Sequence, residues 1–73
     1  MGTTNKGLRL QPSKYYLDKE GSSWCCFKID LNAPMQAQAW CVKVKTHEVE
    51  YFYLDGRYDE KGGREKTLVK EVE

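Results

Sequence analysis

Residues 36–54 read QAQAWCVKVKTHEVEYFYL, and the pattern of this stretch decides the fold. Aromatic and β-branched side chains alternate with charged ones on both sides of residues 46–47, as expected for two antiparallel strands joined by a tight turn. Folding the stretch about this turn pairs Val44 with Val49 and the flanking lysines with glutamates. Such pairs are favourable across two strands, whereas a slip by one residue would place valines opposite charges. The stretch therefore predicts a β-hairpin in this register.

The rest of the chain continues the same signature. Residues 14–18 and 22–31 are rich in aromatic and apolar side chains, and Gly21 supplies turn chemistry between them. Residues 64–73 fit either a fifth strand or a short helix, and we favour the strand. The sequence thus predicts a mainly β fold, an antiparallel meander of four or five strands. Such a meander can curl into a small barrel resembling SH3-like or OB-like folds.

Alternation along the strands sorts the side chains onto two faces, because successive residues of a strand point to opposite sides. One face is apolar throughout and is predicted to be the core. It comprises Tyr15, Leu17, Cys25, Phe27, Ile29, Leu31, Trp40, Val42, Val44, Val49, Tyr51 and Tyr53. The other face mixes charges with large apolar side chains that a solvated surface does not need. We therefore predict a binding surface there, formed by Tyr16, Trp24, Cys26, Lys28, Lys43 and Phe52.

Length and charge limit the domain organisation. The chain has 73 residues, which predicts a single small β domain over residues 14–73, preceded by a flexible N-terminal tail over residues 1–13. A core of this size supplies roughly 3–5 kcal/mol of net stability. The formal net charge is +1, with both signs scattered along the chain, so no strong field would steer the protein to nucleic acid or to an anionic membrane.

The cellular location is predicted to be the cytoplasm. No apolar run approaches the roughly 20 residues of a membrane span, and residues 1–11 lack the hydrophobic stretch of a secretory signal. The three cysteines, Cys25, Cys26 and Cys41, are a poor disulfide framework because their number is odd and two are adjacent. We expect free thiols in the cell, with Cys26 and Cys41 close enough across the strands to be oxidised in vitro.

No catalytic or metal-binding motif is found in the sequence. Cys25, Cys26, Cys41 and His47 could supply metal ligands, but adjacent cysteines of a strand point to opposite faces and cannot easily share one ion. The single histidine has no nucleophile and orienting group beside it in the sequence, and there is no phosphate-binding or dinucleotide-binding fingerprint. The sequence predicts a non-enzymatic protein that needs no metal or cofactor.

Three functions remain open, and we favour the first. It is non-catalytic binding of a partner protein, as in the small adaptors or inhibitors carried by phages and other mobile elements. The second is binding of single-stranded nucleic acid, with bases stacked on Tyr16, Trp24 and Phe52 beside lysines. The third is a structural role as a homo-oligomer. No membrane association is expected in any of them.

Overall fold

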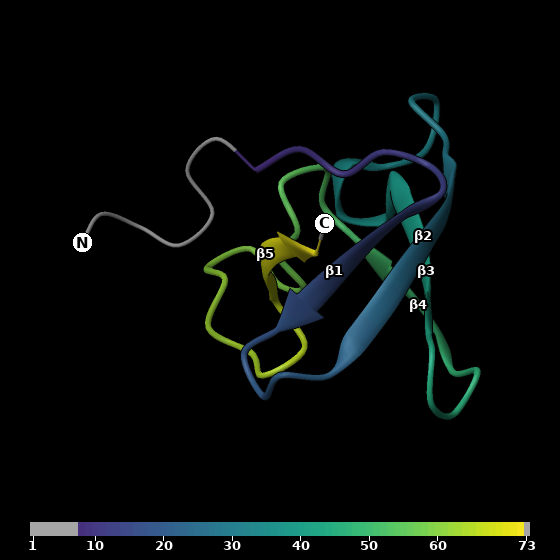
Figure 1. Ribbon diagram of the computed structural model, residues 1–73. Helices are drawn as coiled ribbons and strands as arrows, with labels where there is room; N and C mark the ends of the chain where they lie inside the picture. Colours follow the sequence, from purple (N-terminus) through teal and green to yellow (C-terminus); the bar gives the residue numbers. More distant parts are fainter. Residues whose placement is uncertain (1–7, 73) are drawn as a thin grey trace.

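The computed structural model describes residues 8–72, and the five strands in this range form one antiparallel sheet. Figure 1 shows the five strands, whose spatial order is β4-β3-β2-β1-β5. The elements are β1 (Lys14–Asp18), β2 (Ser23–Ile29), the 3-10 helix η1 (Met35–Ala37), β3 (Ala39–Lys43), β4 (Val49–Phe52) and β5 (Leu68–Val72). The predicted mainly β antiparallel fold is confirmed, with a strand at the C-terminal end. The sheet does not close into a barrel, because β4 and β5 lie at its two edges.

The register of the first three strands agrees with the sequence pattern until a bulge in β2. Tyr15 lies opposite Cys25, in agreement with their predicted place on one face, and Cys26 lies opposite Cys41 as predicted. The register then shifts between Cys26 and Lys28, so that Lys28, which the sequence predicts on the other face, lies opposite Trp40. A bulge places two residues of one strand opposite one residue of its partner. Strict alternation therefore fails after Cys26.

The predicted register of the β3–β4 hairpin is wrong by two residues. Val49 pairs with Val42 and not with Val44. The turn is wider than two residues: the Lys43 amide donates to the Glu48 carbonyl, the His47 amide donates to the Lys43 carbonyl, and each N···O distance is 2.7 Å. His47 has a positive φ of 65°, which closes this wider turn. Because the shift is even, every side chain keeps its predicted side of the sheet.

The two predicted faces are exchanged in the structure, and this is the main correction to the sequence analysis. The buried core includes Tyr16, Trp24, Cys26 and Phe52, each with 0% of its surface exposed. The Trp24 and Phe52 rings meet edge to face with centroids 5.3 Å apart. The predicted core face is instead exposed or only partly covered. Two segments outside the sheet account for this, because both pack on the face that carries Trp24.

The first covering segment is residues 8–13, which the sequence predicts to be part of a flexible tail. Leu10 is 2% exposed, and its amide donates to the Leu54 carbonyl at 2.8 Å. The Gln11 amide donates to the Tyr16 hydroxyl at 2.9 Å. This part of the predicted tail therefore belongs to the domain, while the remainder, residues 1–7, lies outside the described residues.

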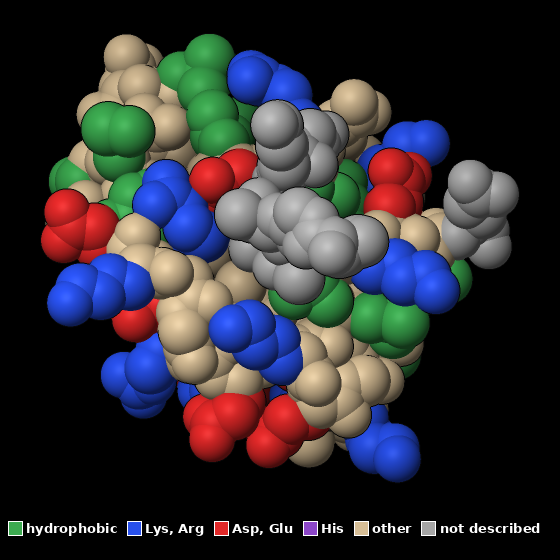
Figure 2. Space-filling model, turned by 90° about the vertical axis from the view of Figure 1, so that its left-hand side faces the viewer, with side chains coloured by type: hydrophobic (Ala, Val, Ile, Leu, Met, Phe, Trp, Pro, Cys, Tyr) green, Lys and Arg blue, Asp and Glu red, His purple; other side chains and the backbone are tan. Residues whose placement is uncertain are grey.

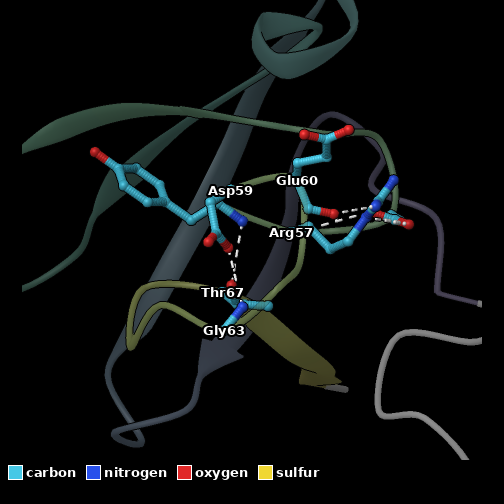
Figure 3. Close-up of polar contacts among 7 residues, drawn as sticks. Arg57, Asp59, Glu60, Gly63 and Thr67 are labelled. Carbon is cyan, nitrogen blue, oxygen red and sulfur yellow. Dashed lines mark hydrogen bonds and ion pairs between the residues drawn. The ribbon is translucent and has the colours of Figure 1, made fainter.

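The second covering segment is residues 53–67, which contain no strand and lie to the left of β2–β4 in Figure 1. Figure 3 shows the polar contacts that fix its shape: Arg57 donates to the Glu60 carbonyl, the Gly63 amide to Asp59, and the Tyr58 amide to the Thr67 hydroxyl. Leu54 and Tyr58 from this segment pack against the core. The segment replaces solvent on one face of the sheet and leaves the other face open.

Gly56 allows this segment to approach β5. Its φ is +94°, and a Cβ atom there would lie 2.7 Å from the Leu68 carbonyl oxygen. Glycine alone adopts this conformation readily and has no Cβ atom to clash. The Leu68 amide in turn donates to the Gly56 carbonyl at 2.7 Å.

The face of the sheet that carries Trp24 is here called the inner face. The charged groups at its border are paired differently from the prediction. Lys66 of the covering segment contacts Glu48 at 2.8 Å and Glu50 at 3.1 Å. The predicted partners were Lys45 and Lys43. The sequence alone could not anticipate this, because Lys66 reaches β4 only through the path of residues 53–67.

Candidate functional site

The face of the sheet that points away from the core, here called the outer face, is unusually apolar for a solvated surface. The most exposed large apolar side chains of its strands are Tyr15 at 49%, Phe27 at 47%, Val49 at 46% and Tyr51 at 46%. They come from β1, β2 and β4, so the exposure extends across the sheet. Single exposed apolar side chains are common on proteins, but a contiguous apolar area on a monomer is often a functional surface.

An aromatic cluster occupies the centre of the outer face. The Trp40 ring contacts Tyr51 at a centroid distance of 5.1 Å and Phe27 at 6.4 Å, both edge to face. Its indole nitrogen donates to the Ala37 carbonyl at 2.9 Å, which fixes the orientation of the ring. Lys28 lies over the same ring, with its Nζ 4.5 Å from the centroid. The bulge in β2 adds Lys28 to this cluster, because the register shift after Cys26 places Lys28 opposite Trp40.

The outer face is large enough to serve as a contact area. The three half-exposed aromatic residues present roughly 300 Å² together, since an aromatic side chain has about 150–250 Å² of surface to bury. Val49, at 46% exposure and beside Tyr51 on the same side of β4, extends this area. The total reaches the range of about 300–600 Å² that is typical of the largest apolar patch on a monomer.

The charge on the outer face is positive. Lys28 lies on it directly, and Lys70 of β5 is on the same side because it pairs with Leu17. No Asp or Glu occupies an outward position of the five strands described between residues 14 and 72. Figure 2 shows a contrasting surface, in which Lys and Arg side chains are interspersed with Asp and Glu.

The predicted site residues do not come together on an exposed surface. Four of the six, Tyr16, Trp24, Cys26 and Phe52, are fully buried in the core and cannot touch a partner in this conformation. Lys43 is on the same side, with its Nζ 5.8 Å from the centre of the Trp24 ring. Lys28 alone lies on the outer face, where the bulge has moved it.

The sequence predicts that the exposed aromatic residues belong to the core, and this prediction is wrong. The pattern of β2, β3 and β4 correctly places Phe27, Trp40 and Tyr51 on one side, yet alternation does not show which side the rest of the chain covers. A usable signal lies outside the strands, in the apolar residues Leu10 and Leu54. Apolar residues outside the strands indicate that these segments pack on the sheet, but they do not indicate on which face.

The two buried thiols face each other in the core and are both free. Cys26 lies directly opposite Cys41, and each is 0% exposed. A hydrogen bond with Cys26 raises the pKa of the Cys41 thiol, and burial raises it further. Cys41 is therefore protonated at neutral pH and has no nucleophilic character.

Other types of site find little support in the structure. Within residues 8–72, no three His, Cys, Asp or Glu side chains lie close enough together to hold a metal ion. A hollow of about 390 Å³ at one end of the sheet is lined by Glu20, Gly21, Ser22, Ser23, Val44 and Lys45, with no histidine or cysteine among them. The described part of the chain also contains no helix long and apolar enough to cross a membrane.

Comparison of the chain with protein-family models, curated proteins and solved structures finds no match. The assignment of function therefore depends on the geometry of the outer face.

Proposed function

We propose that this protein is a non-catalytic binding module that recognises a partner protein through its outer face. One observation carries the proposal. The chain covers one side of its sheet with residues 8–13 and 53–67, and leaves open the other side, where large apolar side chains are about half exposed. A small adaptor or inhibitor acting in the cytoplasm, of the kind that phages and other mobile elements carry, would need such a surface and no chemistry of its own.

The composition of the outer face supports protein recognition. Trp and Tyr are enriched at the positions that dominate binding energy in protein interfaces. Trp40 and Tyr51 are held in a fixed arrangement by the contacts within the aromatic cluster, so little side-chain entropy would be lost on binding. Val42 and Val49 lie opposite each other next to the Trp40–Tyr51 pair, and their stiff β-branched side chains suit close packing against a second apolar surface.

Nucleic-acid binding is less well supported by the same surface. A base would need an open aromatic face to stack on. One face of Trp40 is already occupied by Lys28, and its neighbours meet the ring edge to face. The valines offer no stacking surface, and Lys28 and Lys70 are too few to follow a phosphate backbone.

An affinity capture from lysate tests the proposal when it is combined with matched variants. The wild-type protein, the double variant Phe27→Lys with Tyr51→Lys, and the control Gln11→Lys with Gln36→Lys would each be tagged. Both double variants add the same charge, but Gln11 and Gln36 are exposed positions outside the five strands. Each eluate would be split, and one half would be treated with nuclease before washing.

We expect a partner protein that survives nuclease, is retained by the control variant and is lost from the Phe27→Lys, Tyr51→Lys variant. Recovery of nucleic acid, with any proteins lost on digestion, would contradict the proposal and favour base stacking. Equal recovery by all three proteins would show that the outer face is not the binding surface. Sedimentation of the wild type and of the Phe27→Lys, Tyr51→Lys variant at two concentrations would reveal self-association through the same face, which would favour the homo-oligomer.

A further inference from the structure

We propose that the partner is bound by strand addition, in which an extended segment of it pairs with the free edge of β4 as a sixth strand. This inference rests on the proposed function and specifies the form in which the partner is recognised. Strand addition is a common mode of peptide recognition, where main-chain hydrogen bonds provide affinity and side-chain contacts provide specificity.

The backbone of β4 offers hydrogen-bonding groups on the edge that faces away from β3. Because the Lys43 amide bonds to the Glu48 carbonyl, the alternation of an antiparallel ladder directs Glu50 and Phe52 toward β3 as well. The amides and carbonyls of Val49 and Tyr51 then point away from β3. Among residues 8–72, no backbone group forms a hydrogen bond with any of these four groups.

This free edge is sharply bounded by the protein's own turns. The next outward residue after Tyr51 is Tyr53, whose amide donates to the Arg57 carbonyl at 2.9 Å and whose carbonyl accepts from Gly56 at 2.9 Å. At the other end, the His47 amide is used inside the hairpin turn. The opening therefore comprises Val49 and Tyr51, enough for two hydrogen-bonded pairs with an added strand.

The opposite edge of the sheet, formed by β5, is protected against pairing with another strand. The edge of β4 lacks this protection. β5 begins at Leu68, whose amide is already bonded to Gly56, and its pairing with β1 is interrupted by a bulge. Lys70 and Glu71 add charges along it. Bulges and charged side chains are the usual means of blocking unwanted strand pairing. β4 has neither a bulge nor a proline, and its one charged residue, Glu50, points to the inner side.

The occupant is a different protein and not a second copy of this chain. Two β4 strands pairing antiparallel through Val49 and Tyr51 would set Glu50 directly opposite Glu50 of the copy. Like charges in this position destabilise a strand pair. A partner segment with an uncharged or basic residue at that position avoids the repulsion, and its alternate apolar residues would extend the outer face beside Val49 and Tyr51, which are both 46% exposed.

A displayed library of random peptides of about ten residues, the upper range of strand length, supplies the probe. The wild type would be compared with Val49→Pro and with Val49→Ala. Proline at residue 49 removes an amide that points away from β3, so no bond to β3 is lost, whereas alanine removes the side chain and keeps the amide. Urea unfolding of both variants would verify that they fold.

We expect selected peptides with apolar residues at every second position and no acidic residue opposite Glu50. Their affinity should fall about tenfold or more in Val49→Pro and about threefold or less in Val49→Ala, because an interfacial hydrogen bond of about 1–1.5 kcal/mol is lost only in the former. Amide exchange provides a second readout that needs no variant. The amides of Val49 and Tyr51 should exchange rapidly in the free protein and slow down when a selected peptide binds.

Failure to select any peptide, equal affinity for the proline and alanine variants, or unchanged exchange at Val49 and Tyr51 would overturn strand addition. The proposed function has a separate failure. If the captured partner is lost from the Phe27→Lys, Tyr51→Lys variant but is unaffected by Val49→Pro, the outer face binds protein through side chains alone and the edge of β4 is not used.

Discussion

Tyr51 and Phe52 are neighbours on β4 and have opposite environments. Tyr51 is 46% exposed on the outer face, whereas Phe52 is 0% exposed between Trp24 and Tyr58 on the inner face. Both faces of the sheet are rich in aromatic side chains, so hydrophobicity alone does not distinguish them. The difference comes from the segments that pack over one side, and it separates the residues that stabilise the fold from those that are free to contact a partner.

The largest expected effect comes from truncating these two neighbours separately. Phe52→Ala should cost about 3–5 kcal/mol, because it removes a buried ring and leaves a cavity. That is comparable with the roughly 3–5 kcal/mol expected for a domain of this size, so the variant should be largely unfolded. Tyr51→Ala should cost about 1 kcal/mol or less, since its ring contributes cross-strand contacts on an open face. Urea unfolding followed by circular dichroism measures both, and equal losses would contradict the difference between the faces.

A smaller loss is expected from a buried carboxylate that supports the inner face. Asp18 is 3% exposed and accepts hydrogen bonds from the Trp24 indole at 2.9 Å and from the amides of Glu20 and Ser22. Asp18→Ala should cost about 2–3 kcal/mol, because it leaves buried donors without a partner. Asp18→Asn retains one acceptor oxygen and should lose less. Thermal unfolding would compare them, and an Asp18→Ala variant as stable as the wild type would show that this network is dispensable.

The buried phenol on the inner face should make stability sensitive to alkaline pH. Burial raises the pKa of Tyr16 above its usual value of 10.0. The folded state therefore favours the neutral phenol, and this contribution is complete below about pH 10 and is lost as pH rises through the raised folded pKa. Between pH 9 and 12 the wild type should lose more stability than Tyr16→Phe. Parallel pH profiles for the two proteins would show that Tyr16 ionises as easily when folded as when unfolded.

The smallest effect is expected at the exposed border of the inner face. The contact with Lys66 lowers the pKa of Glu48 below its usual value of 4.5. Its contribution to stability is then present above about pH 4.5 and is lost as pH falls through the lowered folded pKa. Lys66→Met should reduce the loss of stability between pH 7 and pH 3, measured by urea unfolding at each pH. An unchanged loss would mean that this ion pair contributes nothing.

Much of the fold could be predicted from the sequence, because strand propensity and turn residues are local signals. The strands around Tyr15, Cys26 and Cys41 and their pairing follow from alternation. The bulge after Cys26 and the wider turn at His47 could not be predicted, since both depend on backbone geometry that several residue types tolerate. The fold class was therefore correct even though the register of the β3–β4 hairpin was not.

The site was harder to predict because the path of a segment without secondary structure determines which face is covered. Alternation correctly separated Trp24 and Phe52 from Trp40 and Tyr51, yet both sets are large and apolar. The inner face also contains Lys43, which made it look solvated. Lys43 is accommodated beside the Trp24 ring at the border of the core. A charge near the end of a strand is thus a poor guide to which face is exposed.

Hydroxyl-radical footprinting of the free protein, read by mass spectrometry, tests the assignment of the two faces most directly. Adjacent residues serve as internal controls: Tyr15 against Tyr16 on β1, and Tyr51 against Phe52 on β4. Our account predicts rapid oxidation of Tyr15, Phe27 and Tyr51, with Tyr16 and Phe52 protected until the protein is unfolded. Protection of Tyr15, Phe27 and Tyr51 in the folded monomer, with oxidation of Tyr16 and Phe52, would contradict it.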